Sequence, residues 1–423
     1  MRIGVIGAGA AGLAVGRMSL EEIPAAHVTI LEQSDGVGGT WVYADNPFED
    51  QYGLPTHSSM YKSLRTNLPK ETMEFFGFPY DEKHSSVSYL DAQDIVEYLE
   101  QYADHFQLKK NIKFRHHVTS VKPLPEARWE VVAKDLIEDE EKQFEFDTLF
   151  VCNGHLHRPN LISIEGQNVF KGHQLHSHHY RKPEPYKNQK VLVIGSGPSG
   201  MDISKELASV AECVYLSHHD RGVDSIVLPK KVIKKPDVRN LSEESVEFVD
   251  GSVSSIDSVL YCTGYKINMP FLSPECGLEV SDDSVDPLFL HMVNINCPTM
   301  FFIGLINRSF LFPIFEMQAQ FCLRIVNGSV KLPTKGDLLK SWTAESMEVK
   351  LKKRKPHFIG DKMKEYHDFI HDFANTYIYD PVTIKVYEDS GVQKKVNFLN
   401  YRDHLYILID RENYLRKSVK DSS

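Results

Sequence analysis

The stretch "MRIGVIGAGAAGLAVGRMSLEE" at residues 1–22 decides the fold, because it predicts a strand, a glycine-rich turn and a helix in close succession. Its turn has the pattern GxGxxG. Gly7 allows a tight turn, Gly9 lets the backbone approach a pyrophosphate, and Gly12 lets the helix pack closely on the strand. The following strand, "HVTILEQS", leads to Glu32, whose carboxylate can accept a hydrogen bond from a ribose hydroxyl. These features predict a dinucleotide site, with phosphate charge at the helix N-terminus.

The same pattern returns in "QKVLVIGSGPSGMDISKELASV" at residues 189–210. The three glycine positions are occupied by Gly195, Gly197 and Gly200. The next strand, "ECVYLSHH", ends without an acidic residue. Arg221, together with Ser217 or His218, can hold a 2′-phosphate, and this favours NADPH over NADH. Asp220 opposes this interpretation, and a plain surface turn is the alternative for the second motif.

Two strand–turn–helix units in one chain predict an α/β fold with two Rossmann-like dinucleotide-binding domains. Beyond residue 287 the pattern changes to a buried strand in "CPTMFFIGLI" and an amphipathic helix in "FEMQAQFCLRIVNG". We expect an NADPH domain at 166–287, inserted into an FAD domain that comprises 1–165 and 288–423. The region after residue 330 either completes the FAD domain or packs on a second subunit of a homo-oligomer.

Composition restricts the function classes. The chain has 423 residues and a net charge of −10, which argues against nucleic acid as a partner. It has no apolar run of the roughly 18 residues needed to span a bilayer, and no signal peptide is recognisable at its start. These features predict a cytoplasmic protein without a membrane anchor, or a secreted one if a signal peptide has been removed. The six cysteines form no CxxC pair and are expected as core thiols.

Two dinucleotide sites imply a relay in which a tightly held FAD receives a hydride from a dissociable nicotinamide. The first site suits FAD because it has the ribose carboxylate and is followed by "GVGGTW" at residues 36–41. In that stretch Gly39 leaves room for the cofactor and Trp41 can cover a ring. A disulfide reductase needs a redox-active cysteine pair, and a simple oxidase needs no NADPH domain. Elimination therefore favours a monooxygenase.

The stretch "FKGHQLHSHHY" at residues 170–180 resembles the FxGxxxHxxx[FY] motif of the flavin-containing monooxygenases. Tyr180 stands where the Baeyer–Villiger relatives carry Trp, which indicates the N-/S-oxygenating branch. Further segments are similar to motifs of that family in the same order: "TNLPKETMEFFGFP", "VCNGHLHRP", "DSVLYCTGY" and "FEMQAQF". Cys262 replaces the usual Ala in the third of these segments, and Gln320 replaces an Arg in the fourth.

The resemblance implies a reaction as well as a fold. NADPH reduces FAD, O2 adds to give a C4a-hydroperoxyflavin, and a tertiary amine or sulfide attacks its distal oxygen. The short chain looks most like soluble insect members, some of which N-oxygenate pyrrolizidine alkaloids. A broad xenobiotic S-/N-oxygenase, an NADPH oxidase that releases H2O2, and a non-catalytic flavin-binding protein remain alternatives.

The resemblance also implies individual roles. Asn67 matches the family Asn beside the flavin, where a neutral amide donates and accepts hydrogen bonds; an Asn in a turn before Pro69 is the alternative. Gln318 reaches the flavin edge or is a helix-surface amide, and the Val118 backbone contacts the adenine. The expected FAD residues are Gly7, Gly9, Ala11, Gly12, Glu32, Gly39, Thr40, Trp41, Asn67, Leu68, Val118 and Gln318. The expected NADP residues are Gly195, Gly197, Ser199, Gly200, Ser217, His218 and Arg221.

The four histidines of residues 170–180 raise the question of a metal site. The segment contains no Asp, Glu or Cys to complete a ligand set, so no metal is expected. The resemblance makes His176 and Tyr180 structural residues of the connection into the NADPH domain. The other three, His173, His178 and His179, are expected as exposed loop residues.

Overall fold

The computed structural model describes residues 1–419 of the chain. A seven-stranded sheet forms its first half, with the order β20-β21-β22-β7-β1-β2-β3. From β22 to β3 neighbouring strands are parallel, whereas β20, β21 and β22 pair antiparallel. The strands are β1 (Arg2–Ile6), β2 (His27–Leu31), β3 (Ile112–Lys113), β7 (Thr148–Val151), β20 (Leu288–Phe289), β21 (Val293–Asn294) and β22 (Met300–Phe302).

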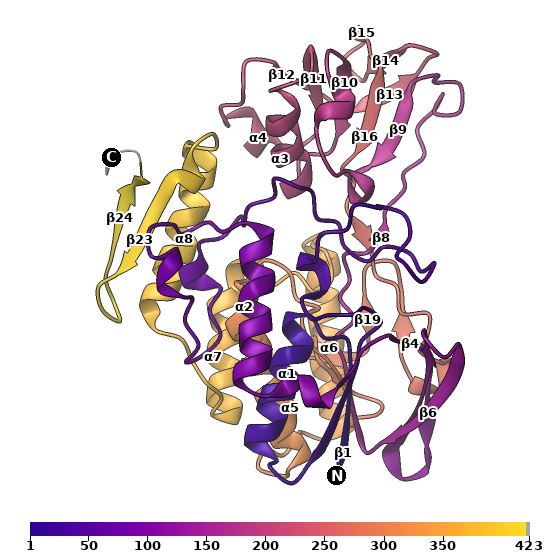
Figure 1. Ribbon diagram of the computed structural model, residues 1–423, viewed down its shortest axis with the longest axis vertical. Coiled ribbons are helices and arrows are strands. Elements are labelled where there is room, and N and C mark those ends of the chain that lie inside the picture. Colours follow the sequence, from indigo (N-terminus) through magenta and orange to yellow (C-terminus); the bar gives the residue numbers. More distant parts are fainter. Residues whose placement is uncertain (420–423) are drawn as a thin grey trace.

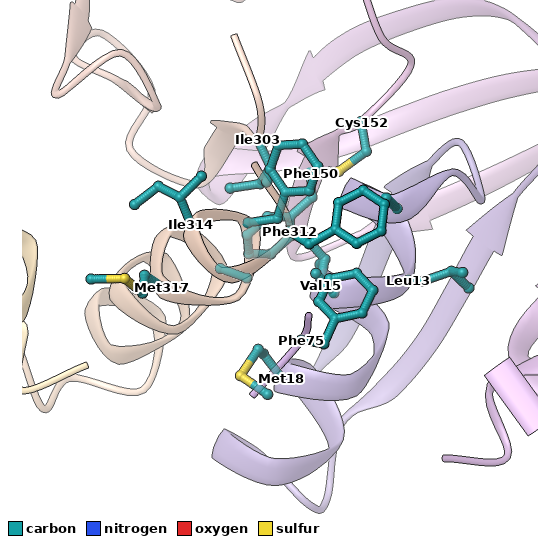
Figure 2. Packing of buried hydrophobic residues seen from close by; sticks show 14 of the residues in the cluster. Leu13, Val15, Met18, Phe75, Phe150, Cys152, Ile303, Phe312, Ile314 and Met317 are labelled. Carbon is teal, nitrogen blue, oxygen red and sulfur yellow. The ribbon is translucent and has the colours of Figure 1, made fainter. Parts of the chain in front are cut away.

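Helices pack against one face of this sheet, in the lower part of Figure 1. They are α1 (Ala10–Glu22), α2 (Ala92–His105), α5 (Leu311–Val326), α6 (Lys335–Leu351) and α7 (Met363–Ala374). Apolar side chains from α1, α5 and the neighbouring strands meet in one core (Figure 2), where Phe75 stacks on Phe312 with ring centroids 5.0 Å apart. The expected helix at 315–328 is therefore present, and it begins four residues earlier, at Leu311.

An antiparallel sheet of β4 (His116–Leu124), β5 (Arg128–Asp135) and β6 (Glu140–Phe146) also belongs to the first half. Its alternating apolar residues bury one face, with Trp129 and Val131 almost inaccessible to solvent. Short two-stranded pairs complete this half. They are β8 (Arg158–Pro159) with β17 (Tyr265–Lys266), and β18 (Glu279–Val280) with β19 (Val285–Asp286).

The second half is built on a five-stranded parallel sheet with the order β12-β11-β10-β16-β9 (Figure 1, top). Its strands are β9 (His173–His176), β10 (Lys190–Ile194), β11 (Cys213–Ser217), β12 (Val232–Lys235) and β16 (Ser258–Tyr261). It also contains α3 (Pro198–Leu207), α4 (Arg221–Asp224) and an antiparallel sheet of β13 (Val238–Leu241), β14 (Ser245–Phe248) and β15 (Val253–Ser255). The predicted α/β class with two parallel, Rossmann-type units is confirmed.

The chain returns to the first half earlier than the expected residue 288. Ile267 and Met269 pack in one apolar cluster with Val118 and Val121 of β4, and the Val121 amide donates to the Phe271 carbonyl over 2.7 Å. The stretch from about 267 onward therefore belongs with the first core. Its apolar residues follow neither the helical nor the strand period, so the sequence offered no signal for this return.

The C-terminal segment packs against both halves. It contains α8 (Pro381–Val396) and the hairpin of β23 (His404–Leu408) and β24 (Tyr414–Ser418). Tyr401 and Tyr406 share an apolar cluster with Tyr61, Tyr89 and residues of the five-stranded sheet, whereas α7 packs in the first core. The region after residue 330 thus contacts both halves of its own chain. Over residues 1–419, no helix combines the length and apolar character needed to cross a membrane.

Candidate dinucleotide and flavin site

The first glycine turn connects β1 to α1. Gly7 has φ +99°, and a Cβ there would lie 2.7 Å from the carbonyl oxygen of Cys152. A Cβ on Gly12 would lie 1.8 Å from the Gly7 carbonyl oxygen, so no larger residue fits at either position. Gly9 is the N-cap of α1 and supplies no side-chain cap. The amides of the first helical turn, which includes Ala11, are therefore available to a phosphate.

The second turn, between β10 and α3, has the same construction. Gly195 has φ +103°, and a Cβ there would lie 2.5 Å from the Cys262 carbonyl oxygen. A Cβ on Gly200 would lie 1.9 Å from the Gly195 carbonyl oxygen. The space around the Cβ position of Gly197 is open, with no heavy atom within 4 Å. Both turns thus fit a pyrophosphate at the carboxyl end of a parallel sheet.

The loop with "GVGGTW" lies directly against the first turn. The Gly38 amide donates to the Ala8 carbonyl over 3.2 Å. A Cβ on Gly39, which has φ +55°, would come within 3.0 Å of the Gly9 Cα. The Thr40 carbonyl accepts from the Ser58 hydroxyl over 2.8 Å. The structure therefore brings Gly9, Gly39 and Thr40 together.

Glu32 follows β2 and is buried beside the first turn. Its Oε2 accepts from the Ala8 amide over 2.6 Å, and its Oε1 accepts from the Ser34 amide over 2.8 Å. The carboxylate is thus held in place, while its remaining lone pairs can accept from a ribose. Val118 is buried on β4, and the register with β5 shifts between Val118 and Ser120. The first residue of β4, His116, donates its amide to the Glu32 carbonyl, so this strand starts beside Glu32.

Trp41 and Leu68 are both half-buried and pack against the first core. The Trp41 ring meets Phe312 edge to face, with centroids 6.5 Å apart. Part of the indole thus packs on protein and the rest is accessible, an arrangement that suits a side chain covering a bound ring.

Asn67 is exposed, and its amide has no hydrogen-bond partner among the described residues. The main chain on both sides is fixed. The Thr66 amide donates to the Leu90 carbonyl over 2.8 Å, and the Lys70 amide donates to the Ser88 carbonyl over 2.6 Å. A rigid segment thus presents a neutral amide to solvent, where it can donate to and accept from a ligand.

Gln318 has a different environment from either expectation. It is completely buried on α5, its Oε1 accepts from the Gly304 amide over 3.1 Å, and its Nε2 donates to the Tyr366 hydroxyl over 2.7 Å. The helix-surface alternative is wrong. The amide is already used inside the protein, so this geometry gives no support to a side-chain contact with flavin. The amphipathic period of α5 could not show that its buried face includes a hydrogen-bonded amide.

The residues expected around the 2′-phosphate are mostly enclosed. The Ser217 hydroxyl is buried and donates to the Pro236 carbonyl over 2.8 Å. His218 is buried, with Nε2 3.6 Å from a carboxylate oxygen of Asp224. Asp220 accepts from the Gly222 amide as the N-cap of α4. Ser199 lies half-buried in the first turn of α3, and the side chain of Arg221 lies outside the described part of the structure.

The histidine-rich segment corrects one expectation. His178 is buried rather than exposed, and its Nε2 lies 2.9 Å from the Thr56 carbonyl oxygen. His179 is half-buried and stacks on Phe48 with centroids 4.7 Å apart, while His173 is exposed on β9. His178 turns inward because the 3₁₀ turn Ser177–His179 follows β9 directly. Nothing in the residue pattern distinguished it from an exposed loop histidine.

Further histidines gather around this connection. His57 stacks on His157 with ring centroids 4.8 Å apart. Burial, followed by repulsion from neighbouring histidines, lowers the pKa of His57 to about 3 and that of His157 to about 4. Within residues 1–419, no three His, Cys, Asp or Glu side chains are arranged to hold a metal ion. The cluster is therefore a group of neutral rings.

Sequence reasoning missed the polar residues that connect these parts. Buried Arg181 donates to the carbonyls of Ala44 (2.6 Å), His178 (2.8 Å) and Ser58 (3.2 Å). Arg402 donates to Asp202 of α3. Except for the Arg181–His178 contact, these contacts join residues more than a hundred positions apart, so no local pattern could have indicated them.

Comparison with known proteins agrees with this geometry. A family model described as flavin-binding monooxygenase-like matches residues 1–223 and 220–398. Senecionine N-oxygenase of Tyria jacobaeae is 32% identical, over 98% of this chain and 92% of that protein. Flavin-containing monooxygenase FMO GS-OX3 of Arabidopsis thaliana is 34% identical, over 87% of this chain and 83% of that protein.

Solved structures give the same result. S-allyl-L-cysteine S-oxygenase from Allium sativum superposes with a TM-score of 0.88 at 29% identity, over 95% of this chain and 94% of that one. Tmm from Pelagibacter sp. strain HTCC7211 has a TM-score of 0.86 at 26% identity, over 96% and 94% of the two chains. Family match, relatives and fold agree over nearly the whole length. This chain belongs to the flavin-binding monooxygenase-like family and is a flavin-dependent monooxygenase.

Proposed function

We propose that this enzyme uses FAD and NADPH to transfer one oxygen atom of O2 to a soft nucleophile, a tertiary amine or a sulfide. The duplicated glycine turn is the observation that carries this proposal. Each parallel sheet has a turn with two glycines at which a Cβ would clash with a main-chain carbonyl oxygen. These glycines are Gly7 and Gly12 in the first turn, and Gly195 and Gly200 in the second. Two pyrophosphate-binding turns in one chain suit a flavin that stays bound and a nicotinamide that exchanges.

The residues of the chain have distinct roles in this proposal. The amides of the first turn and Glu32 bind the pyrophosphate and ribose of FAD, and the turn with Ser199 binds the NADPH pyrophosphate. When bound, the flavin supplies the redox chemistry and the activation of O2. Asn67 donates to and accepts from the reacting region without adding charge. The enzyme needs no nucleophile of its own, because the substrate is the nucleophile and the site has to exclude water.

The substrate class is proposed from the relatives. By their names, one relative is an N-oxygenase of senecionine, and another is an S-oxygenase of S-allyl-L-cysteine. A lone pair on nitrogen or sulfur is common to the two reactions. We therefore propose a tertiary amine, of which a pyrrolizidine alkaloid is the first to test, with a thioether as the second class.

A stoichiometric assay tests the proposal. The flavin-loaded protein is supplied with NADPH and O2, with and without senecionine or a thioether, and NADPH consumed, oxygenated product and H2O2 are quantified. We expect one N-oxide or sulfoxide per NADPH, with little H2O2. Release of H2O2 equal to the NADPH consumed, with every substrate, would instead identify an NADPH oxidase. Absence of bound flavin after purification and reconstitution would exclude both activities.

A further inference from the structure

Arg402 lies between β23 and the end of α8, four residues beyond the end of the family match at residue 398. Its side chain is only 11% exposed. Nη1 donates to Oδ1 of Asp202 over 3.0 Å and Nη2 to Oδ2 over 2.5 Å, a two-bonded ion pair. Nε donates to the Thr66 carbonyl over 2.8 Å, and Nη2 reaches the Arg65 carbonyl at 3.3 Å. One guanidinium thus holds two distant parts of the chain.

The surroundings fix the orientation of this guanidinium. It lies over the Tyr401 ring, 4.8 Å from the centroid. Arg65 donates in return to the Arg402 carbonyl over 3.1 Å and to the Tyr89 carbonyl over 3.0 Å. The Asp202 side chain is only 12% exposed, so removal of either charge would leave the other almost buried and unpaired. A planar fork of donors can satisfy this set of acceptors, and a lysine ammonium cannot.

The two parts held by Arg402 belong to different sites. Thr66 immediately precedes Asn67, the amide proposed to act at the reaction centre. Asp202 lies on α3, whose first turn follows Gly197 of the second glycine turn. Other contacts join the same elements: the Ser63 hydroxyl donates to Glu206 of α3, and Lys205 of α3 donates to the Leu399 carbonyl over 2.6 Å. Arg402 is the group that touches both the residue before Asn67 and α3.

We propose that Arg402 is a positioning residue that sets the place of Asn67 relative to the NADPH-binding turn, so that NADPH oxidation stays coupled to oxygen transfer. This inference rests on the proposed function. Arg402 touches neither substrate nor cofactor in this role. Because misplacement of a reacting group by about 1 Å can cost about a hundredfold in rate, loosening Thr66 would impair oxygen transfer more than flavin binding.

The test compares Arg402→Gln, Arg402→Lys and Asp202→Asn with Arg416→Gln in the full-length, flavin-loaded enzyme. Arg416 pairs with Asp389 over 2.6 Å, inside the same C-terminal segment, and is the matched control. The readouts are bound flavin, melting temperature, and the fraction of oxidised NADPH recovered as N-oxide or sulfoxide. We expect Arg402→Gln to keep its flavin and to lower that fraction about tenfold, with H2O2 replacing product. Arg402→Lys should lose part of this coupled fraction, whereas Arg416→Gln should lose none of it.

Asp202→Asn keeps the size of the side chain and leaves Arg402 on the Thr66 carbonyl, so it should lower coupling less than Arg402→Gln. Asp202→Asn serves as the test variant if Arg402→Gln fails to fold. A variant that melts earlier but couples NADPH to product as the wild type does would overturn the proposal. Equal uncoupling in Arg416→Gln would overturn it too. A wild type that forms no oxygenated product would instead refute the proposed function, so the two failures are distinguishable.

Discussion

The hydroxyl of Tyr180 donates a hydrogen bond of 2.7 Å to Oε2 of Glu206, and thereby ties the end of the 170–180 segment to helix α3. The Ser63 hydroxyl donates to the other oxygen of the same carboxylate. Burial raises the pKa of Glu206, partly offset by these two donors. The tyrosine of the motif therefore stabilises a half-buried carboxylate where three segments of the chain meet.

Replacement of Tyr180 by Phe removes this donor and keeps the ring. We expect a loss of about 1–3 kcal/mol in the free energy of unfolding, because a hydrogen bond to a charged acceptor is lost. Chemical denaturation measures it. Tyr186→Phe is the control, since its ring lies 6.0 Å from that of Tyr180 and its hydroxyl has no hydrogen-bond partner in the part of the chain described. Equal losses in the two variants would contradict the role of the hydroxyl.

Asn67→Ala should keep FAD and lose oxygenation, because the amide is exposed and the segment around it is held by main-chain contacts. We expect a wild-type flavin absorbance and a product yield at least about a hundredfold lower, the usual scale for removal of one preorganised donor in a catalytic site. Lys62→Ala, an exposed position in the same segment, is the control. Normal turnover of a tertiary amine by Asn67→Ala would show that the assignment is wrong.

The two glycines of the second turn should respond differently to alanine. Gly197→Ala adds a Cβ into open space, so stability should not change, while the Michaelis constant for NADPH should rise as the methyl group obstructs the pyrophosphate. Gly200→Ala places a Cβ 1.9 Å from the Gly195 carbonyl oxygen and should cost about 1–3 kcal/mol or more. Thermal melts and NADPH titrations separate the two effects. An unchanged Michaelis constant in Gly197→Ala would argue against a phosphate at this turn.

Acid should destabilise the connection between the two halves. Burial lowers the pKa of His57 to about 3 and of His157 and His176 to about 4. The unfolded chain, with histidines near 6.5, then binds more protons than the folded one, so stability is full above about pH 6.5 and falls toward pH 4. Melting temperature against pH measures this. His57→Gln should flatten the curve, and exposed His173→Gln should leave it unchanged.

Much of the fold followed from local patterns. The glycine turns and the strand before each needed only hydrophobic period and turn chemistry. The pattern failed where long-range packing decides the outcome. The return of the chain near Ile267 and the burial of His178 depend on partners more than a hundred residues away, which no local window contains.

The residues of the candidate site were likewise only partly predictable from the sequence. Residues that act through backbone geometry, such as Gly7 and Gly12, are identifiable because only one residue type fits their positions. Residues that act through a side chain are less readable, because an amide at Gln318 and an amide at Asn67 look alike in sequence. The structure separates them by burial and by their hydrogen-bond partners. No sequence pattern indicated the role of Arg402, because its acceptors are two main-chain carbonyls and a carboxylate on another element.

The shared core of Tyr61, Tyr89, Tyr401 and Tyr406 has a consequence for biosynthesis. A ribosome releases the first two tyrosines early and the last two only at the end of translation. The earlier pair therefore lacks its contacts with Tyr401 and Tyr406 while some three hundred intervening residues are made. A chain truncated before residue 398 would contain both glycine turns but would lack Tyr401 and Tyr406. The aromatic surface formed by Tyr61 and Tyr89 would then be accessible to chaperones and proteases.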